Sequence, residues 1–254
     1  MGNEDAAAAR FAGRALDYDR YRPRYAGAAI NAILDGFSAP VVADVGSGTG
    51  IASRALRDAG ARVIAVEPNA EMRALIVAGP GLDVRAGSAE RTGLDDAAVD
   101  IVTVFQAFHW FDARRALDEF ARILKPGGRL AIVYPGPLLD DMPSAAWQDL
   151  VSRHGEAALV QSLTTVPSMT RIQEDARFRD FRRLVFETDQ KLDRVGLQGR
   201  VRGLSHVPLG GPECDAALAN ADRLFACFAV DGTITIKYRN DVLLGQRVSD
   251  GAFL

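Results

Sequence analysis

The stretch Asp44-Val45-Gly46-Ser47-Gly48-Thr49-Gly50 closes a short apolar run, Val41–Val45, and precedes a helix-forming segment. Glycines in such a turn let the backbone bend sharply and let a ligand approach main-chain atoms without meeting a Cβ. The dinucleotide fingerprint G-x-G-x-x-G would need its third glycine where this chain has Ile51. The turn therefore predicts a ligand-binding loop after a buried strand, but not the dinucleotide type.

Outward from this turn, short apolar runs alternate with helical patterns from Pro40 to about Tyr134. The runs are too continuously apolar for half-exposed strands, so they predict a buried parallel sheet with helices on both faces. Repeated βα units joined by short turns favour a doubly wound α/β sheet with right-handed crossovers. The expected strands are Val41–Val45, Val63–Val66, Leu82–Ala86, Ile101–Phe105 and Leu130–Val133.

Capping residues and glycines set the expected helix ends. The expected helices are Ile51–Ala59, closed by Gly60; a helix from the cap Asn69 through Val77, ended by Gly79-Pro80; and a helix capped by Asp112 and stopped by Pro126-Gly127.

After Tyr134 the alternation of strands and helices ends. Residues 135–176 are polar, and they predict one helix and a cap over the active face. The later strands are expected to form an antiparallel addition at the sheet edge, and the first 30 residues to form a second part of the cover. The expected elements in this half are the helices Ser144–Gly155 and Asp215–Ala229 and the strands Phe181–Thr188 and Thr233–Tyr238.

Composition excludes several classes of protein. A net charge of -3 over 254 residues gives no general attraction to nucleic acid. No apolar run approaches the roughly 20 residues that span a bilayer, and no secretory signal is visible. Cys214 and Cys227 lack metal-ligand spacing, so we expect buried free thiols, no metal site and a soluble, cytoplasmic protein.

Acidic residues at two strand ends are candidates for ligand contact. Glu67 ends the second strand roughly twenty residues beyond Gly46, where an acid can accept hydrogen bonds from both hydroxyls of a ribose. Pro68 fixes the chain direction there, and Met72 could offer an apolar surface to an adenine. Asp44 is placed where it can face a cation. S-adenosylmethionine carries an ammonium and a sulfonium, and it has no pyrophosphate to seat at the helix N-terminus.

The third and fourth strands end in two further candidate segments. Gly87-Ser88-Ala89-Glu90 lies where ligands bind in open α/β sheets; Ser88 could hydrogen-bond an adenine amino group and Ala89 could leave room for its ring. The fourth strand ends in Gln106-Ala107-Phe108-His109-Trp110-Phe111-Asp112. Packing accounts for Phe108 and Phe111. His109 is either a general base near the acceptor or, the reading favoured here, a hydrogen-bonded organiser of the loop.

Three stretches resemble class I S-adenosylmethionine-dependent methyltransferases, in particular the branch of trans-aconitate and ubiquinone/menaquinone C-methyltransferases. They are Tyr18–Pro23, Ala107–Asp112 and Ile123–Gly128, which together with the core from Asp44 to Tyr134 cover about half of the chain. The resemblance implies a Rossmann-like seven-stranded sheet of order 3-2-1-4-5-7-6 with the last strand antiparallel.

The resemblance also assigns expected roles. Asp44, Gly46, Ser47 and Gly48 would surround the methionine part of the cofactor, Glu67 the ribose and Ser88-Ala89 the adenine, while Gln106 would lie near the sulfonium. Tyr18, Tyr21 and Arg22 would form an N-terminal lid, with the arginine paired to the methionine carboxylate. The family usually continues to Tyr-Pro, whereas this chain has Tyr25-Ala26, so the lid can leave at a different angle.

The predicted organisation is one methyltransferase domain over residues 1–254, divided into an N-terminal lid (1–30), a cofactor-binding core (31–134), a cap insertion (135–180) and C-terminal antiparallel strands with a helix (181–254). The predicted activity is methyl transfer from S-adenosylmethionine, leaving S-adenosylhomocysteine, to an oxygen or carbon of a small organic molecule, in secondary metabolism. His109, His154 and His206 are the candidate bases, although good alignment makes a base optional. Two alternatives stay open: a homologue that binds the cofactor without methyl transfer, such as a cyclase or pathway partner, and a nicotinamide-dependent oxidoreductase.

Overall fold

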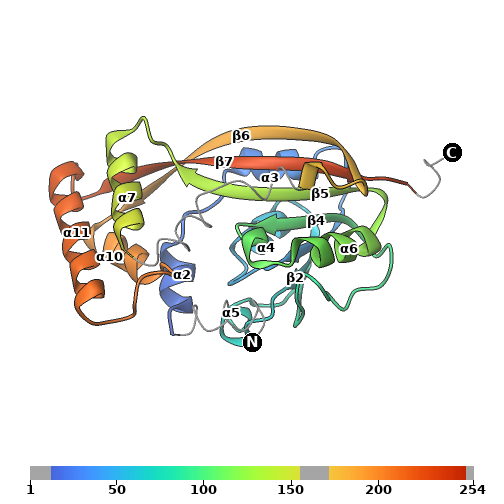
Figure 1. Ribbon diagram of the computed structural model, residues 1–254, viewed down its shortest axis with the longest axis horizontal. Coiled ribbons are helices and arrows are strands. Elements are labelled where there is room, and N and C mark those ends of the chain that lie inside the picture. Colours follow the sequence, from blue (N-terminus) through green and yellow to red (C-terminus); the bar gives the residue numbers. More distant parts are fainter. Residues whose placement is uncertain (1–12, 155–171, 250–254) are drawn as a thin grey trace.

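A seven-stranded sheet of order β3-β2-β1-β4-β5-β7-β6 runs through the computed structural model, which describes residues 13–154 and 172–249 (Figure 1). Strands β1 to β5 are parallel, and β7 runs antiparallel to both neighbours. The predicted order and the antiparallel last strand are confirmed. The strands are β1 Val41–Val45, β2 Arg62–Val66, β3 Leu82–Arg85, β4 Val99–Phe105, β5 Leu124–Pro137, β6 Phe178–Leu192 and β7 Ile234–Arg247.

Three strands are much longer than the apolar pattern predicts. β5, β6 and β7 have 14, 15 and 14 residues, and their ends carry polar side chains that remain in the hydrogen-bonded ladder. Burial alternates along β6, as expected for an edge strand with one covered face. Residues 125–128 form an irregularity within β5 instead of stopping the preceding helix, which ends at Ile123. A continuous apolar run therefore marked only the buried middle of each long strand.

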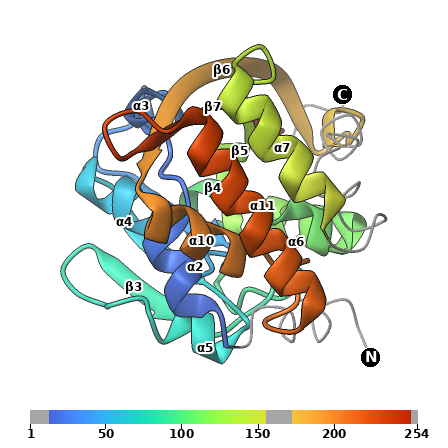
Figure 2. The same ribbon diagram turned by 90° about the vertical axis from the view of Figure 1, so that its left-hand side faces the viewer.

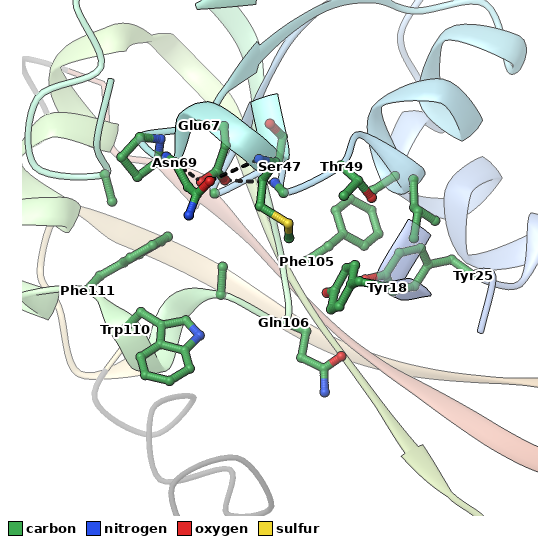
Figure 3. Close-up of a pocket in the computed structure, with 18 residues that line it drawn as sticks. Tyr18, Tyr25, Ser47, Thr49, Glu67, Asn69, Phe105, Gln106, Trp110 and Phe111 are labelled. Atoms are coloured by element: carbon green, nitrogen blue, oxygen red, sulfur yellow. Dashed lines mark hydrogen bonds between the residues drawn. The ribbon is translucent and has the colours of Figure 1, made fainter. Parts of the chain in front are cut away.

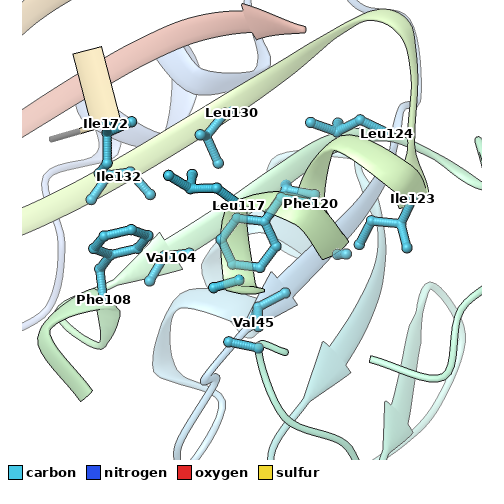
Figure 4. Packing of buried hydrophobic residues seen from close by; sticks show 14 of the residues in the cluster. Val45, Val104, Phe108, Leu117, Phe120, Ile123, Leu124, Leu130, Ile132 and Ile172 are labelled. Carbon is cyan, nitrogen blue, oxygen red and sulfur yellow. The ribbon is translucent and has the colours of Figure 1, made fainter. Parts of the chain in front are cut away.

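Helices cover both faces of the sheet. On one face α3 (Gly27–Leu34) and α4 (Ile51–Asp58) pack against alternate residues of the strands, such as Val42. On the other face α6 (Ala113–Ile123) inserts Leu117 and Phe120 between the strands and the chain around Phe108 (Figure 4). The doubly wound sheet with two apolar faces is as predicted. The helix α3 was not predicted, and it crosses the boundary expected at residue 30.

A group of helices caps the sheet beyond the ends of β5 and β7. It consists of α2 (Ala15–Tyr21), α7 (Met142–Arg153), α10 (Arg194–Arg202) and α11 (Pro212–Phe228), which lie together in Figures 1 and 2. The helices α7, α10 and α11 share an apolar core built around Trp147, Val201 and Leu224, and α2 packs against α10. The cap therefore draws on more than the predicted insertion, because α10 and α11 lie between β6 and β7. The predicted helix α7 begins at Met142, after the capping carboxylate of Asp141, and Gly155 lies outside the described residues.

Two local predictions were wrong. The helix after Asn69, α5, spans only Ala70–Arg73 and does not reach Val77, because the next amides bond three residues back and tighten the turn. Of the two cysteines, Cys214 is a buried thiol but Cys227 is exposed. The buried stripe of α11 continues from Leu224 to the half-buried Phe228, which turns Cys227 towards solvent.

Candidate active site

The glycine loop leads from β1 into α4 and lies beside the end of β2. The amides of Gly46 and Ser47 donate to the carbonyl of Val66, which ties the loop to the neighbouring strand. Gly46 has a φ of +69°, and a Cβ there would lie 2.8 Å from the Cβ of Ala107. Because only glycine tolerates both the left-handed backbone and this approach, the sequence at position 46 is fixed by local geometry.

Glu67 lies directly after β2 and faces the same loop. Its Oε2 accepts the Gly48 amide at 2.8 Å and its Oε1 accepts the Asn69 amide at 2.9 Å. Burial raises the pKa of Glu67, although both hydrogen bonds oppose that shift. A carboxylate oxygen has more than one acceptor position, so Glu67 can still accept donors from a ligand.

A cavity of about 100 Å³ opens between the glycine loop and the strand ends. We call it the loop cavity (Figure 3). It brings together nine of the predicted site residues: Tyr18, Gly46, Ser47, Gly48, Glu67, Pro68, Met72, Ala89 and Gln106. Met72 lies on α5, and the others lie after the carboxyl ends of strands or on the lid, where a ligand was expected.

Unpaired polar atoms point to a polar ligand in the loop cavity. The buried hydroxyls of Ser47 and Thr49 have no hydrogen-bond partner among the described residues, and both residues line the cavity. A buried hydroxyl without a partner is costly unless a ligand or water completes its bonding. Together with Glu67 at one side and Met72 and Ala89 nearby, these groups fit a molecule with polar ends and a flat apolar ring.

Asp44 does not face this cavity, contrary to the prediction that it would face a cation. It is completely buried, and its two oxygens accept the hydroxyls of Ser53 at 2.5 Å and Thr103 at 3.0 Å. Burial raises its pKa to about 6, against the opposing effect of both hydrogen bonds. In a parallel strand alternate side chains point to opposite faces, and Asp44 points to the face covered by α4. Its place is behind the loop, joining β1, β4 and α4.

Tyr21 and Ser88 are also placed outside the loop cavity. The ring of Tyr21 packs against Gly199 of α10, so it joins the lid helix α2 to the cap instead of shielding a ligand. Ser88 exchanges backbone hydrogen bonds with Arg91 in a short turn, and Ala89 alone represents this segment in the cavity.

A second cavity, the cap cavity, lies between the sheet ends and the cap and has a volume of about 610 Å³. It shares Tyr18, Gln106 and Trp110 with the loop cavity. Arg22 lines the cap cavity, stacks 4.9 Å over the Tyr18 ring and donates to Gln106 Oε1. The predicted arginine therefore stands at the boundary between the two cavities and not inside the first.

His109 also lines the cap cavity. Its Nδ1 lies 3.4 Å from the hydroxyl of Tyr134, which also accepts the His109 amide at 3.1 Å, while its buried Nε2 has no partner. Burial, assisted by the nearby Arg22, lowers the pKa of His109 to about 4. The imidazole is therefore neutral near pH 7, held by Tyr134 on one side and free on the other.

Several residues that line the loop cavity could not be predicted as ligand contacts from the sequence. Tyr25, Asn69, Trp110 and Phe111 all line the loop cavity. Asn69 was expected only to cap a helix, which it does by accepting the Met72 amide. Phe111 was assigned to packing, and Tyr25, whose ring lies 4.5 Å from that of Phe105, was noted only as a departure from the family. The cluster of aromatics after β4 was the available signal.

No three His, Cys, Asp or Glu side chains among residues 13–154 and 172–249 gather as a metal site. No helix within those ranges is long and apolar enough to cross a bilayer.

Comparison with known proteins identifies the central part of the chain. Residues 43–132 match the family model described as "Methyltransferase domain". An uncharacterized methyltransferase of Mycobacterium bovis is 44% identical over 118 residues, covering 46% of this chain and 48% of that protein. A ubiquinone/menaquinone biosynthesis C-methyltransferase of Rubrivivax gelatinosus is 41% identical over 93 residues, covering 35% and 36%. The chain thus spans about half or less of the length of these relatives.

Solved structures extend the likeness over most of the chain. A putative type II methyltransferase from Anaeromyxobacter dehalogenans superposes with a TM-score of 0.68 at 25% identity, covering 91% of this chain and 100% of that one. Phosphoethanolamine N-methyltransferase 2 of Haemonchus contortus, solved with S-adenosylhomocysteine, shares the fold with a TM-score of 0.59 at 13% identity, covering 98% and 61%.

The fold, the glycine loop and these matches define a class I, S-adenosylmethionine-dependent methyltransferase domain. More particularly, this chain contains such a domain over residues 43–132, and the resemblance to ubiquinone/menaquinone methyltransferases is confirmed.

Proposed function

We propose that this protein transfers a methyl group from S-adenosylmethionine to an oxygen or carbon atom of a small organic molecule. The observation that supports this most is the meeting of two cavities at Tyr18, Gln106 and Trp110. The loop cavity suits the cofactor, and the cap cavity is the larger space in which an acceptor could bind. The methyl group of a cofactor in the loop cavity would lie at this junction, within reach of an acceptor in the cap cavity.

The proposed cofactor contacts follow from the loop cavity. Glu67 would accept the ribose hydroxyls, Met72 and Ala89 would contact the adenine, and Ser47 and Thr49 would bond the polar methionine end. Gln106, already oriented by Arg22, would lie near the sulfonium. Asp44 contributes as a positioning residue, because its bonds to Ser53 and Thr103 fix the strand from which the loop departs.

When bound, S-adenosylmethionine would supply an electrophilic methyl carbon. The acceptor's electron pair would form the new bond to that carbon as the carbon–sulfur bond breaks, and the electrons of the broken bond would remain on sulfur. This chain's contribution is alignment and exclusion of water, which can account for roughly 7–11 kcal/mol of a barrier. Where the acceptor loses a proton, the Nε2 of neutral His109, which lines the cap cavity, would be the group to take it. Its low pKa makes it a weak base, and its bond to Tyr134 equally supports the organising role.

Calorimetric titration tests the cofactor site first. We expect the wild type to bind S-adenosylmethionine and S-adenosylhomocysteine and not NADH, and Glu67→Ala to bind both sulfur ligands more weakly. Glu187→Ala, an exposed glutamate of β6, is the matched control. Binding of NADH in their place would favour the nicotinamide-dependent oxidoreductase, and folded protein that binds neither sulfur ligand would overturn the proposal.

Release of S-adenosylhomocysteine during incubation with pools of small molecules tests catalysis. Cofactor binding without any turnover across carbon, hydroxyl and carboxylate acceptors would favour the homologue without methyl transfer. Four points stay predictions: a role in secondary metabolism, a cytoplasmic location, the absence of a nucleic-acid partner, and the division of the chain at residues 30, 134 and 180.

A further inference from the structure

Arg200 is a buried cation that the proposed chemistry does not use. It lies on α10, is only 6% exposed, and lines the cap cavity. Its guanidinium stands 5.5 Å over the ring of Trp147 and contacts the phenol of Tyr238, and its buried Nε has no hydrogen-bond partner. Within residues 13–154 and 172–249 no carboxylate forms an ion pair with it. A buried charge without a counter-ion is costly, so its retention calls for a ligand.

The other arginines of the cap cavity are already partnered. Arg183 and Arg239 both bind Asp241, at 2.6 and 2.9 Å, so this acid is shared by two cations. The other acid of the described wall, Asp140, is exposed to solvent. Arg22 donates to the neutral amide of Gln106. The described wall of the cavity therefore carries more positive than negative charge, with Arg200 as its buried, unneutralised member.

Nearby titratable groups do not offset this charge. His206 lines the same cavity, and burial, opposed by its bond to the Val151 carbonyl, lowers its pKa to about 4, so it is neutral near pH 7. Burial and the neighbouring Arg22 lower the pKa of Arg200 to about 10, which still leaves the guanidinium charged at neutral pH. Apolar side chains line the same cavity, including Leu204 and Trp147, whose ring Arg200 contacts.

We infer that the methyl acceptor is an amphipathic carboxylate, whose anionic head binds Arg200 while its apolar body extends through the cap cavity to the junction at Gln106. This inference rests on the proposed function, since it assigns the substrate class of the same site. A guanidinium binds a carboxylate through two parallel hydrogen bonds. The apolar walls favour a ligand with one charged head over a highly charged one. Arg200 does not line the loop cavity, so this role is separate from holding the cofactor.

Tryptophan fluorescence provides a direct test, because both tryptophans of the chain, Trp110 and Trp147, line the cap cavity. In a Trp110→Phe background the signal comes from Trp147 beside Arg200. The protein is first saturated with S-adenosylhomocysteine, with saturation confirmed by calorimetry. It is then titrated with 4-phenylbutyrate, decanoate, their uncharged amides and phenyl phosphate.

We expect the carboxylates to bind at least tenfold more tightly than the matched amides. Arg200→Met should abolish this preference and Arg200→Lys should weaken it, while affinity for S-adenosylhomocysteine stays unchanged in both. Arg183→Gln is the matched control, because its charge is offset by Asp241, and it should keep the preference.

Three outcomes would overturn the inference in a protein that binds S-adenosylhomocysteine normally. They are equal binding of acids and amides, absence of carboxylate binding at millimolar concentration, and tighter binding of phenyl phosphate than of any carboxylate. A loss of cofactor affinity in Arg200→Met would also overturn it, by moving Arg200 to the cofactor. Failure of the wild type to bind S-adenosylhomocysteine would instead count against the proposed function.

Discussion

The carboxylate of Glu67 accepts the backbone amide of Gly48 at 2.8 Å, which joins the end of β2 to the glycine loop after β1. The same side chain lines the loop cavity (Figure 3). One residue therefore shapes the loop and offers its remaining acceptor positions to the ligand. Loss of its charge should disturb binding more than folding, because the backbone of the loop is also held by Val66.

Glu67→Gln tests this relationship. In glutamine, an amide nitrogen replaces one of the two carboxylate oxygens that accept the amides of Gly48 and Asn69, and the negative charge is lost. Hydrogen bonds to charged groups are worth about 1.5–3 kcal/mol each. We expect roughly 10- to 100-fold weaker binding of S-adenosylhomocysteine by calorimetry, with Glu187→Gln binding like the wild type. An unchanged dissociation constant would remove Glu67 from the ligand site.

Asp44 should give an unusual pH dependence of stability. Its folded pKa of about 6 lies above the ordinary value of 3.8, so between these values the folded state holds a proton that the unfolded state has released. Its contribution to stability therefore falls as pH rises from about 4 to 6, by on the order of 3 kcal/mol. Asp44→Asn does not titrate. As pH rises from about 4 to 6, we expect the free energy of unfolding of this variant in urea to increase relative to that of the wild type. A difference that stays constant with pH would contradict the raised pKa of Asp44.

The buried histidines should titrate well below the usual range. Burial lowers the pKa of both His109 and His206 to about 4, so acidification from about 6.5 to 4 charges the unfolded chain first and destabilises the fold. Imidazole resonances assigned with His109→Asn and His206→Asn variants would measure both values by NMR. Because Arg22 contributes to the shift at His109, Arg22→Met should raise that pKa; a midpoint near 6.5 in the wild type would show an exposed ring.

Gly199 holds the lid helix against the cap. A Cβ there would lie 2.2 Å from the ring of Tyr21, so Gly199→Ala must displace the ring. Overpacking of this kind costs typically 1–3 kcal/mol, more than the ~1 kcal/mol that alanine gains as a helix former. We expect Gly199→Ala to be destabilised in urea unfolding.

A double-mutant cycle supplies the control for this clash. Gly199→Ala combined with Tyr21→Ala should be more stable than the sum of the two single effects, since the ring is gone. Gly136→Ala, where a Cβ meets nothing within 4 Å, should leave stability nearly unchanged. Strict additivity of the two changes would show that the ring and residue 199 do not interact.

The core of the fold could be predicted because its signals are local. The glycine loop, the apolar runs of β1 to β4 and the cap at Asp112 depend on neighbouring residues, and all were found near their predicted positions. The lengths of β5, β6 and β7 could not be predicted, because their polar ends are held by ladder partners far away in the chain. The helix α10 was not predicted either. From the sequence its Arg200 looks like a surface residue, because the cap that buries it comes from distant parts of the chain.

The sequence by itself determined the class of domain and where its ligand-binding loop lies, because residues such as Gly46 and Glu67 stand at fixed short distances from strand ends. Only the tertiary structure decided which face each side chain takes. It turned Asp44 towards α4, placed Tyr21 against Gly199, and set Arg22, His109 and Arg200 around a second cavity. The physical reason is that orientation and burial depend on elements packed from distant parts of the chain, which local spacing does not encode.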